Sequence, residues 1–329
     1  MGFGLWRKWR SSARSGTHVT VIEWREDGLL ALRTTPSADG PPRVADAEVI
    51  ECAADQRDAC IARLARQGWF GGRTIVLLGI RQRQMAMLPR PTVPDAELVE
   101  AARWQLQGAL DYPPEEAVLD VLHVGVDEPP ARQQLAVFAV RRSALAQWLA
   151  PLAARKIKVE AVEVADCAQR NLAALHPAKG QAMAMLSLRE HSIVFSVTRG
   201  SEVLVSRSFD AAGVTAAATP ATSAAPALAA DETSALADRV GLQLQRMLDT
   251  LERRSAAMAP SQILVLGHPQ HTPLLTQCAE LTGLRVLPLE LGALMAPAEG
   301  SATSTAAIDG DLFHLLGAAL RPAPVEAVA

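Results

Sequence analysis

Residues 19–34 read VTVIEWREDGLLALRT, which predicts two strands joined by a tight turn at Asp27-Gly28. A second segment, AMLSLREHSIVFSVTRG over residues 184–200, repeats this pattern with the same Arg-Glu pair at its turn. Each hairpin precedes a third strand, a helix and a continuous apolar strand, TIVLLGI in the first half and QILVLG in the second. A βββαβ unit therefore occurs twice, which predicts an α/β fold of two similar lobes.

Composition limits the functions that this chain can have. Its 329 residues are 49% hydrophobic and 20% charged, enough for about two domains with substantial cores. The net charge of −3 and the pI near 6.2 provide no basic field, which argues against nucleic-acid binding. The four cysteines form neither a CxxC pair nor a zinc pattern, and a reduced, cytosolic compartment is expected. No apolar run is long enough to cross a membrane.

The segment between the two repeats predicts a small inserted domain over residues 84–158. The stretch MAML predicts a strand, and a helix is expected to start near Pro94-Asp95 and to end at DYPPEE, residues 111–116. Two alternating strands and a helix over residues 143–154 follow. Two helices combined with strands in this order indicate a ferredoxin-like insert.

The expected domain organisation follows from these segments. It comprises a basic-aromatic, disordered leader (1–17), a first lobe (18–83 and 159–180), the insert (84–158), a second lobe (181–321) with a flexible Ala/Thr/Pro/Ser-rich loop (211–230), and a disordered tail (322–329).

The leader combines cations with aromatic residues and has no acidic residue. Such a segment can lie at an anionic bilayer surface, because Trp prefers the interface and cations are attracted to it. A solvated leader without membrane contact is the alternative. The candidate membrane-surface residues are Trp6, Arg7, Lys8, Trp9 and Arg10.

Four segments resemble the PilM/MshI family, the actin-like cytoplasmic components of type IV and MSHA pilus assembly. The most specific is LPRPTVPDAELVEAARWQLQGALDYPPEEAVLDVLHV, in which the helix, the Asp-Tyr-Pro-Pro break and the next strand keep the family's order. The others are RRSALAQWLAPLAARKIKVEAVEVADCAQRNLAAL, ILVLGHPQHTPLLTQCAELTGLRV and DLFHLLGAALR. The cytoplasmic part of type II secretion L-like proteins looks similar, but those proteins continue into a membrane span.

The resemblance implies an actin-like fold, in which two RNase H-like lobes carry the ferredoxin-like insert in the first lobe. It implies a scaffold on the cytoplasmic face of the inner membrane. In the family, a groove between the insert and the first lobe receives the cytoplasmic N-terminal tail of a bitopic inner-membrane pilus protein. Self-association is a further expectation. Trp104 and Leu106, on the helix that helps to wall this groove, are candidate partner contacts, and packing within the helix is the alternative.

The resemblance also indicates where a nucleotide would bind. Actin-like proteins grip phosphates with both hairpins through an Asp-x-Gly pattern, in which Gly lets backbone N–H groups approach the phosphate. Both hairpins here have Arg in place of that Gly, and neither keeps the Asp. We therefore expect no cofactor and no catalysis, and an active ATPase that binds Mg-ATP is the rival hypothesis. The altered pocket positions are Glu23, Arg25, Gly28, Ser187, Arg189 and Gly267.

Two further clusters have ordinary explanations. His268 and His271 form an HxxH pair, but metal ligation needs a third ligand, so a helix-entry loop is the favoured interpretation. Asp111, Glu115 and Glu116 are expected to form a solvated turn and not a catalytic site. We therefore expect no metal.

Overall fold

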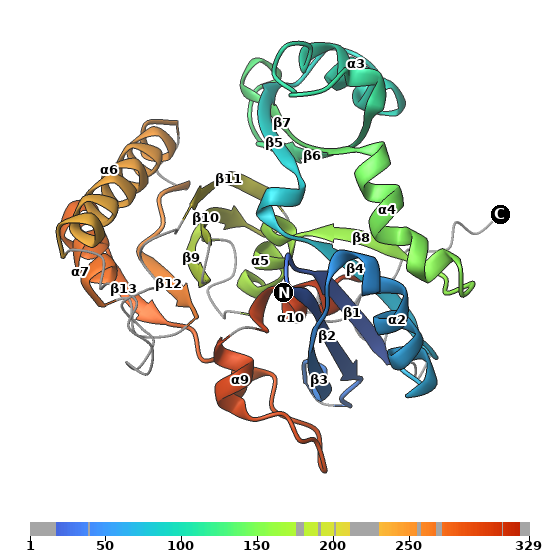
Figure 1. Cartoon of the computed structure of the whole chain (residues 1–329). Helices are drawn as coiled ribbons and strands as arrows, with labels where there is room; N and C mark the ends of the chain where they lie inside the picture. Colours follow the sequence, from blue (N-terminus) through green and yellow to red (C-terminus); the bar gives the residue numbers. More distant parts are fainter. Residues whose placement is uncertain are drawn as a thin grey trace. The chain divides into compact units, whose positions relative to one another are not determined.

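The computed structural model describes residues 18–38, 40–175, 181–189, 192–200, 202–210, 230–254, 258–267, 272–310 and 312–322. The chain divides into two compact units (Figure 1). Unit 1 comprises residues 1–172, 294–304 and 314–329, and unit 2 comprises residues 173–293 and 305–313. The leader 1–17, residues 211–229 of the predicted loop, the HxxH pair and tail residues 323–329 lie outside the described residues.

The first unit is built on a mixed five-stranded sheet. β1 pairs antiparallel with β2 and parallel with β4, and all six residues of β1 are buried. In β4, the continuous apolar run predicts burial, and all its residues after Arg73 are buried. The strands are β1 (Val19–Trp24), β2 (Gly28–Thr35), β3 (Arg43–Glu51), β4 (Arg73–Leu78) and β8 (Ala161–Val164), in the order β3-β2-β1-β4-β8.

The second unit repeats this sheet strand for strand. Its strands are β9 (Met183–Arg189), β10 (Ser192–Arg199), β11 (Glu202–Asp210), β12 (Gln262–Leu266) and β13 (Arg285–Pro288), in the order β11-β10-β9-β12-β13. Each sheet has an irregularity where its second strand pairs with its third, at Arg33/Thr34 and at Val197/Thr198. The offset that places Glu23 on Ser187 also places Arg33 on Val197. The predicted duplication is therefore confirmed down to this local distortion.

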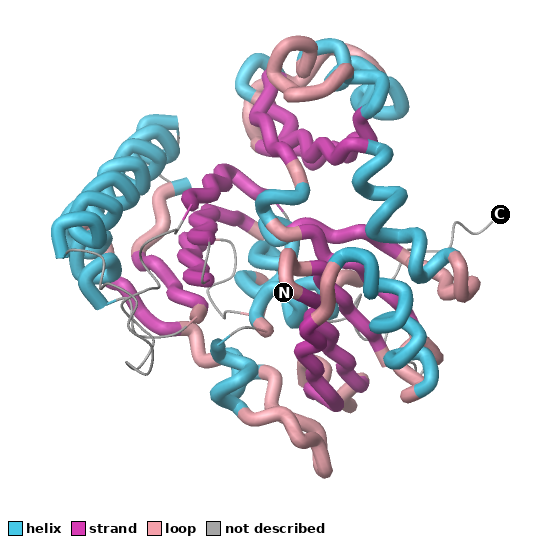
Figure 2. Tube along the Cα trace, in the orientation of Figure 1, coloured by secondary structure: helices cyan, strands magenta, loops and turns pink. Residues whose placement is uncertain are grey.

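Helices flank the strands of both sheets (Figure 2). In unit 2, α6 and α7 pack side by side, with Gly241 of α6 close to Leu281 of α7. The α-helices are α2 (Arg57–Arg66), α3 (Leu98–Gln105), α4 (Arg142–Ala153), α5 (Ala165–Ala173), α6 (Ala230–Arg254), α7 (Thr272–Thr282), α8 (Leu291–Leu294), α9 (Thr305–Gly310) and α10 (Phe313–Ala319). The 3-10 turns are η2 (Ala54–Gln56), η3 (Ile80–Gln82), η4 (Asp95–Glu97), η5 (Pro114–Glu116) and η6 (Pro130–Arg132).

The insert is a three-stranded antiparallel sheet with a helix on one face. Its strands β5 (Gln84–Pro89), β6 (Ala117–Val124) and β7 (Gln134–Arg141) lie in the order β5-β7-β6. This keeps the first part of the ferredoxin-like βαββαβ order. The strand that would complete that order is β8, which instead pairs with β4 in the first sheet. The α4 helix also leaves the insert, because its Trp148 carbonyl accepts a hydrogen bond from Trp24 Nε1 at 3.0 Å.

Three predicted boundaries need correction. The first turn lies at Glu26-Asp27, because Arg25 N–H donates to the Gly28 carbonyl at 2.8 Å and Gly28 already belongs to β2. The α3 helix ends at Gln105 and not near residue 111, since i→i+3 turns follow and Gly108 has a φ of +83°. Ala230, which was expected in the loop 211–230, is the first described residue of α6 and belongs to that helix.

The C-terminal helix α10 lies in the first unit except for Phe313, whereas residues 181–321 were all expected in the second lobe. Its Gly317 packs on α5 so closely that a Cβ atom would lie 2.1 Å from the Ala168 carbonyl oxygen. Asn171 Nδ2 donates to the Gly317 carbonyl at 2.9 Å. Close contact with α5 therefore draws this segment, distant in sequence, into the first unit.

Candidate functional site

Glu23 and Gly28 of the first hairpin are held by the sheet itself. Glu23 is buried at the carboxyl end of β1. Its Oε1 atom lies 3.5 Å from the point where a Cβ atom would stand if Gly79 carried a side chain. Gly28 has no left-handed φ, and its lack of a side chain serves a different purpose. A Cβ on Gly28 would lie 2.2 Å from the Ile50 carbonyl oxygen of β3. Gly28 therefore allows two strands to pair closely and does not mark a phosphate-binding turn.

The loop after β4 is tied to this hairpin by one side chain. Gln82 accepts a hydrogen bond from Gly79 N–H through Oε1 at 2.8 Å and donates to the Trp24 carbonyl through Nε2 at 3.1 Å. These are main-chain groups at the carboxyl ends of two adjacent parallel strands, an edge where α/β proteins commonly bind ligands. The Gln82 side chain thus gives both main-chain groups a hydrogen-bond partner within the protein. No sequence pattern marks this glutamine.

The polar side chains of the second hairpin contact other groups of the same chain. Ser187 is buried, and its hydroxyl donates to the Val194 carbonyl of β10 at 3.4 Å. The Arg189 guanidinium lies 5.4 Å from the centroid of the buried Phe313 ring, a cation–π geometry. Gly267 has a φ of +103° and approaches Leu188, where a Cβ would lie 2.4 Å from the carbonyl oxygen. These contacts give each position a structural role within the second unit.

The two candidate partner residues at the end of α3 differ in their exposure to solvent. Leu106 is 2% exposed and belongs to the core that α3 forms with the insert sheet. Trp104, two residues earlier, is 66% exposed. The assignment of Leu106 as a partner contact is therefore corrected: its side chain packs inside the insert. For Trp104, the alternative of helix packing is wrong.

The insert sheet has a second face, defined by Met85, Met87, Val118, Asp120, Leu122 and Phe138. In the strand register, Met85 and Asp120 lie on either side of Phe138. The residues that alternate with these along each strand point the other way, into the core under α3. Met85, Met87, Val118 and Leu122 are half-buried, and Asp120 is exposed. Figure 1 shows α3 on the side of this sheet away from β8. The second face is thus an apolar surface that α3 does not cover.

A buried ion pair anchors the insert next to this face. Arg83 directly precedes β5, and its Nε and Nη2 atoms donate to Asp166 Oδ2 of α5 at 2.9 and 2.5 Å. Both side chains are buried. The pair fixes the start of the insert to the first lobe, so that the second face keeps a defined position within unit 1.

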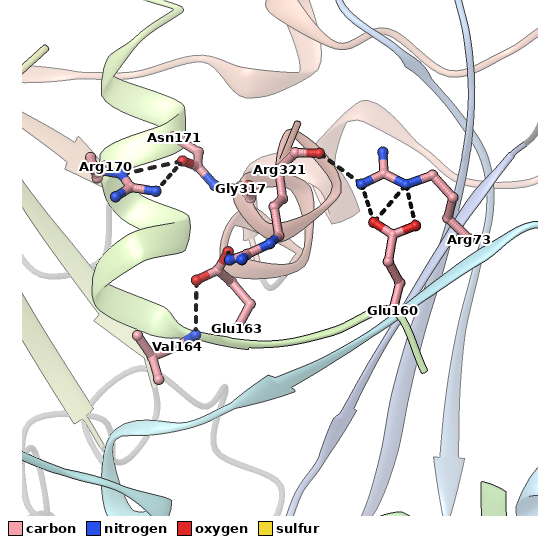
Figure 3. A network of polar contacts seen from close by, with 8 residues as sticks. All are labelled: Arg73, Glu160, Glu163, Val164, Arg170, Asn171, Gly317 and Arg321. Atoms are coloured by element: carbon pink, nitrogen blue, oxygen red, sulfur yellow. Dashed lines mark hydrogen bonds and ion pairs between the residues drawn. The ribbon is translucent and has the colours of Figure 1, made fainter. Parts of the chain in front are cut away.

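A second group of charges joins β4, β8, α5 and α10 (Figure 3). Arg321 Nη1 donates to Glu163 Oε2 at 2.7 Å, and Arg73 donates both to Glu160 and to the Arg321 carbonyl. Burial lowers the pKa of the Arg321 guanidinium, but the charge and hydrogen bond of Glu163, with a smaller contribution from Asp120, outweigh it and raise that pKa. Asp120 of the second face is therefore within electrostatic range of Arg321.

Neither of these charge groups was predicted. Arg83 lies in RQRQ and Asp166 in VEVAD, short stretches without a pattern that relates one to the other. The only signal was an arginine directly before an apolar strand and an aspartate two residues after another strand. Such residues pair only when the fold brings those two strand ends together.

The described residues also bear on two other kinds of site. No group of three or more His, Cys, Asp or Glu side chains among them lies close enough together to hold a metal ion. Within the same residues, no helix combines the length and the apolar character that a bilayer span requires.

Comparison with known proteins identifies the fold. A chain of the PilM-PilN type IV pilus biogenesis complex superposes with a TM-score of 0.67 at 18% identity, covering 93% of this chain and 99% of that one. The chain has the actin-like ATPase fold. A crystal structure of a protein with that fold from Bacteroides thetaiotaomicron also matches, with a TM-score of 0.51 at 9% identity, over 92% of this chain and 96% of that one. No protein-family model and no curated protein matches the sequence.

Proposed function

We propose that this protein is a non-catalytic actin-like scaffold of type IV pilus assembly, of the MSHA type. It binds the cytoplasmic N-terminal tail of a bitopic inner-membrane protein. The likeness to a chain of the PilM-PilN complex over nearly the whole of both chains supports this choice among proteins of the fold. The MSHA assignment rests on the sequence resemblance to the PilM/MshI family.

The second face of the insert sheet is the observation that carries the proposal. It presents half-buried Met85, Met87 and Leu122 around Phe138, and Arg83 and Asp166 anchor it to the first lobe. Such a surface suits a short apolar segment, and the exposed carboxylate of Asp120 on this face can orient the charges of that segment. A rigidly held apolar surface also limits the ordering cost of binding a flexible tail.

Trp104 marks a competing surface of the insert. It lies on α3, whose buried residues Leu98 and Ala102 pack on the opposite face of the sheet. Trp104 is a single exposed apolar side chain on α3, whereas the second face combines several apolar side chains. We therefore assign the tail to the second face, and the variant Trp104→Ala tests the competing surface.

The contacts at the two hairpins support a non-catalytic role. Ser187 and Arg189 are engaged with Val194 and Phe313, and Gln82 occupies main-chain groups at the end of β1 and after β4. The rival function is an active ATPase of the same machinery. The buried carboxylate of Glu23 beside Gly79 favours that rival, because a carboxylate there can hold Mg²⁺ through water.

The basic-aromatic leader completes the proposal. Its Trp and Arg residues suit the anionic face of a bilayer, which would place the protein peripherally on the cytoplasmic side of the inner membrane. Vesicles that contain anionic lipid should shift the tryptophan emission of the full chain to the blue. A variant with Trp6→Ala and Trp9→Ala should lose that shift, and an equal shift in both proteins argues against the leader.

Calorimetry with tail peptides tests the scaffold function. The probes are synthetic N-terminal tails of bitopic inner-membrane pilus proteins from the same organism, titrated without nucleotide. The variant Leu122→Glu should weaken binding at least about tenfold, because a charge would enter the apolar contact. Val126→Glu is the matched control, since Val126 is an exposed apolar residue of the insert outside the second face. Loss of binding in Trp104→Ala and not in Leu122→Glu would assign the tail to α3.

A thermal melt with millimolar Mg-ATP separates scaffold from ATPase. A ligand at about 100 times its dissociation constant adds about 2.7 kcal/mol to the folded state, which raises the melting temperature by several degrees. We expect no shift. A clear shift that disappears in Glu23→Gln would establish the rival function, and tail binding that strictly requires Mg-ATP would do the same.

A further inference from the structure

The α6 helix packs on the second unit with one face and leaves the opposite face to solvent. Its buried residues recur with the period of a helix that packs on one side, and they are Ala237, Val240, Leu244, Leu248 and Leu251. Figure 1 shows α6 along the outside of unit 2. Residues of this helix that point away from the buried ones are therefore available to another molecule.

Three arginines form a row along this outer face, and we call them the arginine stripe. Arg239, Arg246 and Arg253 are exposed and follow one another at intervals of seven residues. Because an α-helix turns by about 100° per residue, all three lie within about 40° of one another, on the side away from the buried residues. At a rise of about 1.5 Å per residue, the stripe extends over about 21 Å.

The positive charge of the stripe is not neutralised within the described part of the chain. No carboxylate there pairs with any of the three guanidinium groups. Arg253 Nε donates at 3.1 Å to the main-chain carbonyl of Asp249, one turn earlier in the same helix. Exposed arginines contribute little to folding, so this row of charges is better suited to binding than to stabilising the helix.

The segments outside the described residues offer no acidic counterpart to this stripe. The leader contains no acidic residue, and residues 211–229, which lead into α6, are uncharged. The other undescribed positions contain only isolated acidic residues, namely Asp39, Glu190, Asp311 and Glu326. A row of carboxylates that matches the stripe must therefore come from another molecule.

The narrowness of the stripe indicates what kind of molecule fits it. Asp249 and Asp238, which accepts a hydrogen bond from Gln277 at 2.7 Å, are exposed on the same helix beside the stripe. A bilayer or a nucleic acid presents negative charge over a broad surface and would meet these carboxylates as well. A helix that packs along α6 presents a single line of side chains. At a shallow crossing angle, a seven-residue repeat on one helix stays in register with a seven-residue repeat on the other.

We propose that the arginine stripe of α6 is a docking surface for an acidic amphipathic helix of a partner protein, in which Asp or Glu recurs every seven residues. Each carboxylate of that helix accepts hydrogen bonds from one guanidinium group. Leu242, which is 41% exposed and lies between Arg239 and Arg246 in sequence, adds an apolar contact. The stripe belongs to unit 2 and the second face of the insert to unit 1, so this surface is additional to the one assigned to the tail.

Fluorescence anisotropy with a designed peptide tests the proposal on the full chain. The probe is a dye-labelled helical peptide of about 20 residues, rich in Ala and Gln, with Glu at three positions seven residues apart and one Leu beside them. We expect saturable binding at low ionic strength. The double variant Arg239→Glu with Arg246→Glu should weaken it at least about tenfold, because two attractions become repulsions. Added salt should weaken binding to the wild type, since it screens exposed charges.

Matched controls separate the stripe from general charge effects. Arg142→Glu should bind the peptide like the wild type, since Arg142 is exposed at the first position of α4, where Glu suits the helix dipole. A peptide with Lys in place of Glu should not bind. Should the double variant fail to fold, Arg246→Gln replaces it, with an expected loss of about threefold.

Three outcomes overturn the proposal. One is a wild-type chain that does not bind the acidic peptide, and another is equal binding by the wild type and the double variant. The third is binding of anionic vesicles that the double variant loses, without any binding of the peptide, which would assign the stripe to a membrane. Binding of the tail peptides should be unchanged in the double variant, so this test and that of the scaffold function can fail separately.

Discussion

Arg83 and Asp166 form an ion pair with only 5% and 0% of their side chains exposed. Arg83 directly precedes β5, the first strand of the insert, and Asp166 lies at the start of α5. The pair therefore joins two segments that are far apart in sequence. Burying two charges is costly, and their attraction and hydrogen bonds must offset that cost. The pair therefore stabilises one particular docking of the insert. Replacing one of the two residues should lower the stability of the fold more than replacing both.

The first prediction concerns this pair. Arg83→Met should lower the free energy of unfolding by about 3–5 kcal/mol, because it leaves the Asp166 carboxylate buried without its partner. The double variant Arg83→Met with Asp166→Leu should lose much less than the two single variants together. Denaturation by urea measures both quantities. Arg81→Met is the control, since the Arg81–Glu26 pair is 51% and 82% exposed and should contribute less than about 1 kcal/mol. Equal losses at Arg81 and Arg83 would contradict the prediction.

The second prediction concerns the contact between α10 and α5. Gly317→Ala should destabilise the protein by about 1–3 kcal/mol, since the new Cβ would collide with the Ala168 carbonyl and push the two helices apart. Gly40→Ala is the matched control, because a Cβ there meets nothing within 4 Å and should change stability by less than about 0.5 kcal/mol. Thermal unfolding compares the two variants. A neutral Gly317→Ala would mean that α10 is not packed on α5 in solution.

The third prediction concerns neighbouring residues of the insert. Leu106→Ala should cost about 2–5 kcal/mol, because Leu106 fills the core between α3 and the sheet. Trp104→Ala should change stability by less than about 0.5 kcal/mol, because its side chain is mostly in solvent. Chemical denaturation monitored by circular dichroism measures both. A large loss in Trp104→Ala would show that the tryptophan is a packing residue after all.

The fourth prediction concerns stability at alkaline pH. Burial raises the pKa of the Cys278 thiol from 9.0 to about 12. Between these values the unfolded chain releases a proton that the folded chain keeps, so rising pH favours unfolding. This group's contribution is complete below pH 9 and declines by about 1.4 kcal/mol per pH unit above it.

Cys278→Ala should therefore flatten the fall of unfolding free energy above pH 9 relative to the wild type. Below that pH, the difference between the two proteins should stay constant. Urea unfolding at a series of pH values gives both slopes. Parallel curves across the whole range would contradict burial of the thiol.

Local pattern was sufficient for the elements of both sheets. The apolar run of β4 and the repeat of the first hairpin predicted two lobes, and the strands formed close to their expected bounds. The errors concerned the ends of elements, where a single hydrogen bond or backbone conformation sets the boundary. The turn at Glu26-Asp27 depends on a single Arg25–Gly28 hydrogen bond, and the end of α3 depends on the conformation of Gly108. The return of the chain to the first sheet after the insert was predicted, since residues 159–180 were expected in the first lobe, and β8 does pair with β4.

The candidate site was less accessible to sequence reasoning. The pattern around Trp104 and Leu106 did not tell which of the two points into the core, and the structure buries only Leu106. Comparison of the hairpins located Ser187 and Arg189, yet the contact of Arg189 with Phe313 depends on packing with a segment distant in sequence. Gln82 carried no signal at all, since a glutamine becomes informative only when two free main-chain groups lie within its reach.

The sequence by itself determined the duplicated βββαβ order, the two buried central strands and the position of the insert, because period-2 and period-3.6 patterns are properties of consecutive residues. Only the tertiary structure decided that Arg83 meets Asp166 and that α10 returns to α5. These contacts join residues on separate elements, and their strength depends on burial. Burial is a property of the assembled core and is not encoded in any one segment.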